Sequence, residues 1–203
     1  MSINIFESLN MRIIAGSAKG CHIEAPNRRA TRPATDLVRG AVFSILENLA
    51  TNWDEVLDLY SGSGAMGIEA LSRGAGHVDF VEHSPECCAI IKQNLAKTKL
   101  ADQAHIYCTE VQKALSFLIE EYGIIIMDPP YPDLSIGDVV TKLSTTKLLK
   151  PETIVVVTHS PHHALEESYG KLKRLKEHRH GDSVIAIYQE EAFLDNRALP
   201  REF

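Results

Sequence analysis

The chain has 203 residues, a length that suits one domain with a full hydrophobic core. Its 21 lysines and arginines against 27 aspartates and glutamates give a net charge of −6, which argues against a protein that coats nucleic acid with its whole surface. The four cysteines form no Cys-x-x-Cys pair, no apolar run approaches the roughly 20 residues of a membrane span, and the first residues lack the pattern of a signal peptide. We therefore expect a cytoplasmic α/β protein that contacts no membrane.

Basic side chains are concentrated near the N-terminus. Residues 11–39 carry six lysines and arginines against two acidic residues, a local charge of +4, so this segment is the candidate contact for a polyanion. Within it, residues 11–15 and 22–25 flank a Gly/Ser/Lys stretch, which indicates a small β-hairpin. We therefore expect residues 1–34 to be a leader and a hairpin extension. A second basic run, residues 171–180, alternates with leucines and indicates the solvated face of a strand.

Beyond the extension, strand patterns and helix patterns alternate. Helices are expected from Thr35-Asp36, over 65–72, after the capping sequence Ser84-Pro85-Glu86, through Val111 to Ile119 and over 134–149. Strands are expected at 56–60, 77–82, near 106, at 123–127 and at 153–158, followed by two late strands near 171–178 and 183–189 without a helix between them. The alternation predicts that residues 35–190 form a Rossmann-like domain with a seven-stranded, mostly parallel sheet and a terminal antiparallel hairpin. Residues 191–203 would be a tail.

A glycine-rich turn joins the first strand of this domain to its first helix. It runs from Asp58 to Gly64, and Gly62 and Gly64 let the backbone turn sharply and approach a ligand closely. The spacing matches the dinucleotide pattern G-x-G-x-x-G, in which a helix N-terminus holds a pyrophosphate. In the alternative reading the ligand is S-adenosylmethionine (SAM), with its amino group on Asp58 and its ribose on Glu82, which ends the next strand. We favour SAM because Asp58 would repel a pyrophosphate.

Glu110 is a further acidic residue at a strand end. Its carboxylate would accept the adenine amino group of the cofactor, or it would simply favour the positive end of a helix dipole, and the sequence leaves both readings open. The candidate cofactor-binding residues share a place at the strand ends and in the turn; they are Asp58, Tyr60, Ser61, Gly62, Gly64, Glu82, His83, Glu110 and Val111.

A buried strand ends in Asp128-Pro129-Pro130-Tyr131. Consecutive prolines donate no ladder hydrogen bonds and must end the strand, which leaves its last carbonyls pointing outward. The exocyclic amine of a nucleobase is a poor nucleophile, because its lone pair is delocalised into the ring. If Asp128 and the Pro129 carbonyl each accept one amine hydrogen, the lone pair can be aimed at a methyl group, while Tyr131 stacks on the base. We therefore predict that Asp128, Pro129, Pro130 and Tyr131 are catalytic in methyl transfer to a planar amino nitrogen.

The tetrapeptide also bears on the kind of target. Extruding a base from a duplex costs a few kcal/mol, whereas stacking on one aromatic ring returns roughly 1–3 kcal/mol. The target is therefore expected to be unpaired, as in an RNA loop, or to be held through phosphates by residues 11–39. A metal is not expected, because the four histidines that lie close in sequence match no zinc signature; they are His162, His163, His178 and His180.

Several stretches together resemble the RsmD family, bacterial 16S rRNA guanine-N2 methyltransferases, from Met11 to about Gln189. They are residues 12–16, Lys19-Gly20, 32–39, 62–75 and the tetrapeptide. The resemblance implies a class I SAM-dependent methyltransferase that modifies 16S rRNA within a partly assembled small subunit. It further implies that Arg32, Thr35 and Arg39 line a cleft between the extension and the cofactor. Together with Arg28 and Arg29 of the basic segment, these are the candidate RNA-binding residues, and we expect a monomer.

Other functions are compatible with parts of this pattern. A DNA adenine or cytosine amino-methyltransferase uses the same tetrapeptide, although no long insertion for target recognition is present. A non-catalytic RNA-binding assembly factor would have no need of an intact acceptor cluster beside an intact glycine turn. An NAD-dependent dehydrogenase would need a hydride-transfer site, which we do not find.

Overall fold

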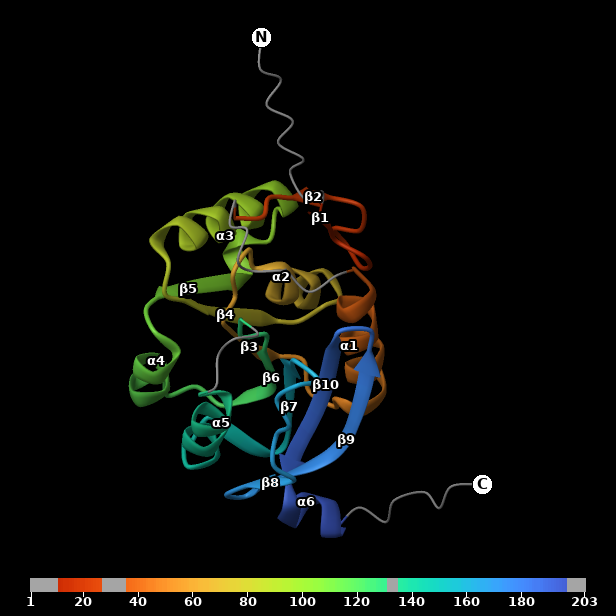
Figure 1. Ribbon diagram of the computed structural model, residues 1–203. Coiled ribbons are helices and arrows are strands. Elements are labelled where there is room, and N and C mark those ends of the chain that lie inside the picture. Colours follow the sequence, from red (N-terminus) through yellow and green to blue (C-terminus); the bar gives the residue numbers. More distant parts are fainter. Residues whose placement is uncertain (1–10, 27–35, 131–134, 197–203) are drawn as a thin grey trace.

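The structure, a computed structural model, describes residues 11–26, 36–130 and 135–196. Its main strands are β3 (Glu55–Leu59), β4 (His77–Glu82), β5 (Ala104–Cys108), β6 (Tyr122–Met127), β7 (Leu149–His159), β8 (Ser168–Tyr169), β9 (Leu172–His180) and β10 (Ser183–Glu190). They form one sheet in the order β5-β4-β3-β6-β7-β10-β9-β8 (Figure 1). A separate antiparallel pair, β1 (Met11–Arg12) and β2 (His22–Ile23), confirms the predicted N-terminal hairpin.

The direction of the strands places the candidate site. Five strands from β5 to β7 are parallel, whereas β10 runs antiparallel between β7 and β9. The chain moves outward from β3 to β4 and β5 and then returns to β6 on the other side of β3, so a topological switch point lies between β3 and β6. Ligands of open α/β sheets bind at the carboxyl ends of the strands at such a point. The predicted Rossmann-like fold is confirmed, and the two-residue edge strand β8 adds an eighth strand to the seven expected.

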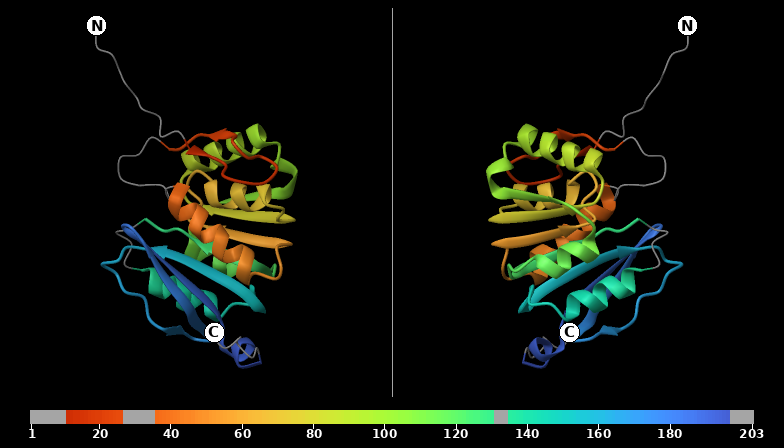
Figure 2. Two further views of the ribbon diagram at one scale, coloured as in Figure 1. Left: turned by 90° about the vertical axis from the view of Figure 1, so that its right-hand side faces the viewer. Right: turned by 90° about the vertical axis from the view of Figure 1, so that its left-hand side faces the viewer.

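Helices cover both faces of the sheet. They are α1 (Asp36–Leu49), α2 (Ala65–Ser72), α3 (Pro85–Thr98), the 3-10 helix η1 (Ala101–Gln103), α4 (Val111–Phe117), α5 (Ile136–Ser144) and α6 (Glu191–Asn196). The core residues of α1, α2 and α3 pack with the N-terminal hairpin against one face, and those of α4 and α5 pack against the other. Figure 2 shows the two layers on either side of the strands. No helix in the described ranges is long and apolar enough to cross a bilayer.

Alternation along the strands divides the core in two. In β6, Ile124 and Ile126 pack toward α1, α2 and α3, while Ile125 and Met127 pack toward α4 and α5. All six residues of β6 are buried, as expected for a parallel strand covered on both faces. The same alternation determines which polar side chains at the carboxyl ends of the strands point to the same face of the sheet.

Two of the predicted helices are shorter than expected. The helix predicted over 134–149 ends at Ser144, and Leu149 already begins β7. Its end is fixed by two hydroxyls, since Thr145 Oγ1 donates to Lys142 O and Thr146 Oγ1 to Leu143 O, both at 2.7 Å, in competition with further helical turns. The prediction that Ile119 packs on the face of the preceding helix is wrong, because α4 ends at Phe117 and Ile119 is 81% exposed.

Candidate active site

The glycine turn between β3 and α2 is held in a left-handed backbone conformation. Tyr60, Gly62 and Gly64 have φ angles of 62°, 56° and 79°, of which only the glycines adopt such values at little cost. Ser61 Oγ donates to Asp58 O at 2.6 Å, and Gly64 N donates to Ser61 O at 2.7 Å, so the turn closes on itself. Tyr60 is not a glycine, so its positive φ costs energy that the surrounding structure must offset. Backbone positions of this kind cluster at functional sites.

Asp58 is the second-to-last residue of β3 and is 1% exposed. Its Oδ2 accepts a hydrogen bond from Gly67 N at 2.9 Å, whereas Oδ1 has no hydrogen-bond partner among the described residues. Burial raises the pKa of Asp58 to about 8, and the neighbouring charges of Asp128 and Glu82 act in the same direction. A buried carboxyl oxygen without a partner is unusual and calls for an explanation, which a cationic donor on a ligand would supply.

Glu82 joins the turn to the end of β4. Its Oε2 accepts from Gly62 N at 2.9 Å and its Oε1 accepts from Ser84 N at 2.8 Å, with His83 Nδ1 at 3.1 Å from Oε1. Each carboxylate oxygen has two lone pairs, so Glu82 can hold the backbone and still accept hydroxyl groups.

A pocket opens beside Glu82. Its walls come from the ends of β3 and β4 and from the start of α4; they are Tyr60, Val81, Glu82, His83, Glu110, Val111 and Gln112. Glu110 is exposed and occupies the N-cap position of α4 without making a side-chain capping bond, an arrangement compatible with both the ligand reading and the helix-dipole reading. Sequence reasoning missed Val81 and Gln112, although each is the chain neighbour of a predicted residue.

The predicted catalytic residues follow β6, directly beside the glycine turn. Asp128 N donates to Leu59 O at 3.5 Å, Pro129 is buried and Pro130 is exposed. Thr158, near the end of β7, donates its hydroxyl hydrogen to Asp128 Oδ1. Sequence reasoning missed Thr158, whose signal is a polar residue at the end of an apolar strand. Tyr131 lies outside the described residues, and within the described ranges no group of three potential metal ligands occurs.

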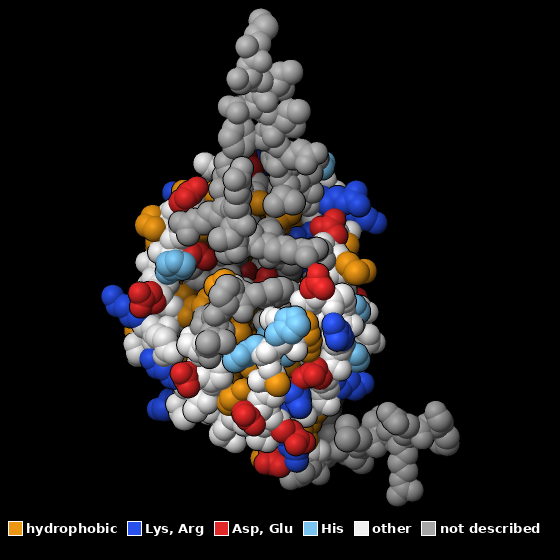
Figure 3. Space-filling model, in the orientation of Figure 1, with side chains coloured by type: hydrophobic (Ala, Val, Ile, Leu, Met, Phe, Trp, Pro, Cys, Tyr) orange, Lys and Arg blue, Asp and Glu red, His pale blue; other side chains and the backbone are white. Residues whose placement is uncertain are grey.

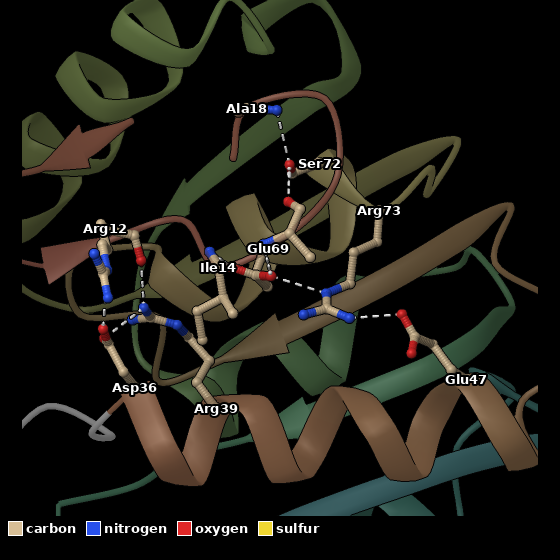
Figure 4. Close-up of polar contacts among 10 residues, drawn as sticks. Arg12, Ile14, Ala18, Asp36, Arg39, Glu47, Glu69, Ser72 and Arg73 are labelled. Atoms are coloured by element: carbon tan, nitrogen blue, oxygen red, sulfur yellow. Dashed lines mark hydrogen bonds and ion pairs between the residues drawn. The ribbon is translucent and has the colours of Figure 1, made fainter. Parts of the chain in front are cut away.

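The N-terminal segment of residues 11–26, called the arm below, is fastened to α2. Glu69 Oε2 accepts from Ile14 N at 2.7 Å, and Glu69 Oε1 accepts from Ala15 N at 3.0 Å and from Arg73 Nε at 2.8 Å. Ser72 Oγ donates to Ala15 O at 2.5 Å and accepts from Ala18 N at 2.9 Å. Figure 4 shows Glu69 and Ser72 directed from α2 toward the arm. The helix that follows the glycine turn therefore also positions the candidate RNA-contact segment.

Arg39 is the one described member of the predicted RNA-binding set. It is 0% exposed, and its Nη2 donates to Arg12 O at 2.5 Å and to Asp36 Oδ1 at 2.9 Å (Figure 4). Burial lowers the pKa of Arg39. In this structure Arg39 therefore supports the base of the arm. The other members lie outside the described residues; they are Arg28, Arg29, Arg32 and Thr35.

Comparison with known proteins places the chain in a family. Residues 11–189 match the family described as conserved hypothetical protein 95. The chain belongs to this family. The match to conserved hypothetical protein 95 spans both the arm and the site at the carboxyl edge, and it confirms the RsmD resemblance.

Relatives of this member of the conserved hypothetical protein 95 family carry methyltransferase names. YlbH of Bacillus subtilis (strain 168), provisionally named an rRNA methyltransferase, is 32% identical over 89% of this chain and 99% of its own length. Ribosomal RNA small subunit methyltransferase D of Escherichia coli (strain K12) is 29% identical over 90% of this chain and 91% of its own length. A solved structure of Escherichia coli YhhF, provisionally named a methyltransferase, has a TM-score of 0.77 at 28% identity and covers 90% of this chain and 99% of that chain. The fold is therefore that of a methyltransferase.

Proposed function

We propose that this protein transfers a methyl group from SAM to the exocyclic N2 amine of a guanine in 16S rRNA of the small ribosomal subunit. The observation that carries the proposal is the placement of Asp128 and Pro129 at the carboxyl end of β6, beside the glycine turn that follows β3. The hydrogen bond between Asp128 N and Leu59 O joins the two strand ends. A cofactor held by the turn and an amine held by the tetrapeptide would meet at this edge.

The residues present fit SAM. Oδ1 of Asp58 has no hydrogen-bond partner in the described part of the chain and suits the cofactor's ammonium group, and the remaining lone pairs of Glu82 suit ribose hydroxyls. Val81 and Val111 give the pocket apolar walls, while Glu110 offers an acceptor for an adenine amine. When bound, SAM supplies an electrophilic methyl group on a sulfonium.

The protein's own contribution is alignment of the amine. Asp128 and the carbonyl of Pro129 would accept the two amine hydrogens, which turns the nitrogen lone pair out of conjugation. Thr158 fixes the orientation of the Asp128 carboxylate through its hydroxyl. Correct alignment of two reactants is worth roughly 7–11 kcal/mol of barrier, so a general base is not required at the start.

The choice of ribosomal RNA is supported by the names of the relatives and by the basic segment of residues 11–39. The Escherichia coli relative is named a ribosomal RNA small subunit methyltransferase, and YlbH is provisionally named an rRNA methyltransferase. The segment 11–39 has a local charge of +4 in a chain of net charge −6. We infer that the partner is 16S rRNA in an assembling small-subunit particle, and that the protein acts in the cytoplasm as a monomer.

The test is incubation of the purified protein with SAM labelled in its methyl group and one of three substrates. These are free 16S rRNA, small-subunit particles that lack the modification, and duplex DNA. We expect label in N2-methylguanosine from the rRNA or the particles. Label in DNA would support the rival amino-methyltransferase, label in another nucleoside would overturn the guanine assignment, and binding of RNA without transfer would indicate an assembly factor.

A further inference from the structure

The hairpin of β9 and β10 reaches the same edge of the sheet as the catalytic tetrapeptide. Met127 at the end of β6 lies opposite Val157 of β7, and Val184 at the start of β10 lies opposite His159 of β7. The turn between β9 and β10 is therefore two to three strands away from Asp128, about 10–14 Å at a spacing of about 4.8 Å per strand. Figure 2 shows this turn on the same side of the molecule as the start of α1.

The basic residues on β9 and directly before it differ in their ion-pair partners along the strand. At the far end from the tetrapeptide, Lys171 pairs with Glu190 at 3.2 Å and Lys173 with Glu191 at 2.9 Å. Arg174 pairs with Glu177 at 2.6 Å. The charges on that half of the strand are therefore largely neutralised.

The half of β9 near the tetrapeptide is different. Lys176 and Arg179 are exposed, and within the described residues neither has an acidic partner, since Arg179 Nε donates only to the carbonyl of Gly181. Two acidic residues lie close to them in sequence: Glu177, which pairs with Arg174, and Asp182 in the turn. One side of this half pairs with β10, whereas on the other side the described strand β8 pairs with β9 only as far as Lys173, so this half also forms an open edge of the sheet.

Two exposed histidines belong to this end of the sheet, and alternation along β9 places His178 on the same face as Lys176, with Arg179 on the other face of the open edge. His178 is exposed on β9, and His162 is exposed on the loop after β7, where its backbone N donates to Ser160 Oγ at 3.2 Å. Figure 3 shows histidine side chains gathered on the face turned to the viewer, with lysine and arginine side chains beside them. Histidine rings can stack on unpaired bases, and exposed cations can neutralise phosphates.

We propose that the carboxyl-edge end of the β9–β10 hairpin, with Lys176 and Arg179 as its cations and His162 and His178 as stacking groups, is a second RNA-contact surface. It holds the strand of RNA that leaves the tetrapeptide on the side opposite the arm. The inference rests on the proposed function for the identity of the RNA. It extends that function, because the protein would then contact the RNA on both sides of the target base, through the arm on one side and through this hairpin on the other.

The experiment compares RNA binding by two double variants. Lys176→Gln with Arg179→Gln removes the proposed contacts, whereas Lys99→Gln with Lys147→Gln removes the same charge from exposed positions at the opposite edge of the sheet. Binding of a labelled 16S rRNA fragment is measured over a range of salt concentrations, with SAM affinity measured in parallel. We expect the first variant to bind RNA several-fold more weakly and to lower the salt slope by roughly 1.4–1.8, because each lost phosphate contact contributes about 0.7–0.9. The control variant and both SAM affinities should be unchanged.

Three outcomes would overturn the inference. Equal RNA affinities and slopes for the two variants, with methylation of rRNA by the wild type intact, would remove the second surface and leave the proposed function standing. Wild-type protein that neither binds nor methylates 16S rRNA would remove both. Charged residues on an edge strand also prevent pairing between molecules, so self-association of the first variant in light scattering, with unchanged RNA affinity of its monomer, would assign Lys176 and Arg179 to that role instead.

Discussion

The carboxylate of Glu69 accepts a hydrogen bond from the backbone N–H of Ile14 at 2.7 Å, across 55 residues of sequence. The same completely buried carboxylate binds Ala15 N and Arg73 Nε. We expect Glu69→Ala to lower the free energy of unfolding by about 3–5 kcal/mol, because it leaves two backbone N–H groups unpaired and removes the buried partner of Arg73. Urea unfolding measures the change.

Glu47→Ala is the matched control for this prediction. Glu47 is the other acidic partner of Arg73, at 2.6 Å, but its side chain is 53% exposed. Exposed ion pairs contribute about 0–1 kcal/mol, so the loss should be small. If the two variants were destabilised equally, Glu69 would not be the residue that holds the arm.

The arm approaches α2 closely at Gly16. A Cβ at Gly16 would lie 1.7 Å from Ser72 O, whereas a Cβ at Gly20, which has the same φ of 81°, would meet nothing within 4 Å. We expect Gly16→Ala to displace the arm and to speed its cleavage in limited proteolysis. Gly20→Ala carries the backbone penalty alone, roughly 1–2 kcal/mol, and serves as the control. Identical cleavage rates would show that the close approach at Ser72 does not hold the arm in place.

Local signals account for most of what the sequence could predict. Three features depend only on residues that are neighbours in sequence: the alternation of strand and helix, the turn at Gly62 and Gly64, and the cap at Ser84. The structure has these elements in the expected places. The predicted end of α5 is wrong because the leucines after Ser144 continue an apolar pattern that suits a helix and a buried strand equally. The hydroxyls of Thr145 and Thr146 end the helix instead, by donating to carbonyls of its last turn.

Contacts between distant segments could not be predicted in the same way. Thr158 meets Asp128 only because β7 lies beside β6 in a particular register, and the alternation along both strands then puts the two side chains on one face. Glu69 lies in the stretch 62–75 that carries the family resemblance, but its contacts are with an arm far away in sequence. Arg39 was expected in a cleft, but the structure buries it at the base of the arm.

The affinity for SAM is expected to depend on pH through Asp58. Its pKa is raised to about 8 by burial, so at neutral pH it is mostly protonated, and a cationic donor on its Oδ1 requires the ionised form. Between pH 6 and 7.5, below the ionisation of a typical α-amino group, affinity should rise about tenfold per pH unit, with close to one proton released on binding. Calorimetry in two buffers of different protonation enthalpy measures both quantities. A flat profile in the wild-type protein would contradict the role of Asp58.

The same group should affect stability without ligand. A folded-state pKa near 8 against an ordinary value of 3.8 means that the folded chain binds more protons than the unfolded chain between these values, so stability falls as pH rises through this window. Asp58→Asn cannot ionise, so it should lose both this fall in stability and the pH dependence of SAM binding. Thermal unfolding between pH 5 and pH 9 tests this. Parallel curves for the variant and the wild type would show that Asp58 titrates normally.

The hydroxyl of Thr158 is expected to act on turnover through Asp128. Asp128→Ala should reduce kcat by about 100-fold or more, with SAM affinity nearly unchanged, because alignment of the amine is lost. Thr158→Val leaves the carboxylate in place but removes the bond that orients it, so kcat should fall by about tenfold, in line with the worth of a hydrogen bond to a charged group. Thr158→Ser should restore most of the rate. Thr153→Val is the control, since it removes a buried hydroxyl from the first half of β7, where Oγ1 donates to Tyr122 O at 2.6 Å, and should reduce stability without changing kcat. Single-turnover kinetics separate these effects, and a Thr158→Val protein that lost SAM affinity while keeping its kcat would place Thr158 in the cofactor site instead.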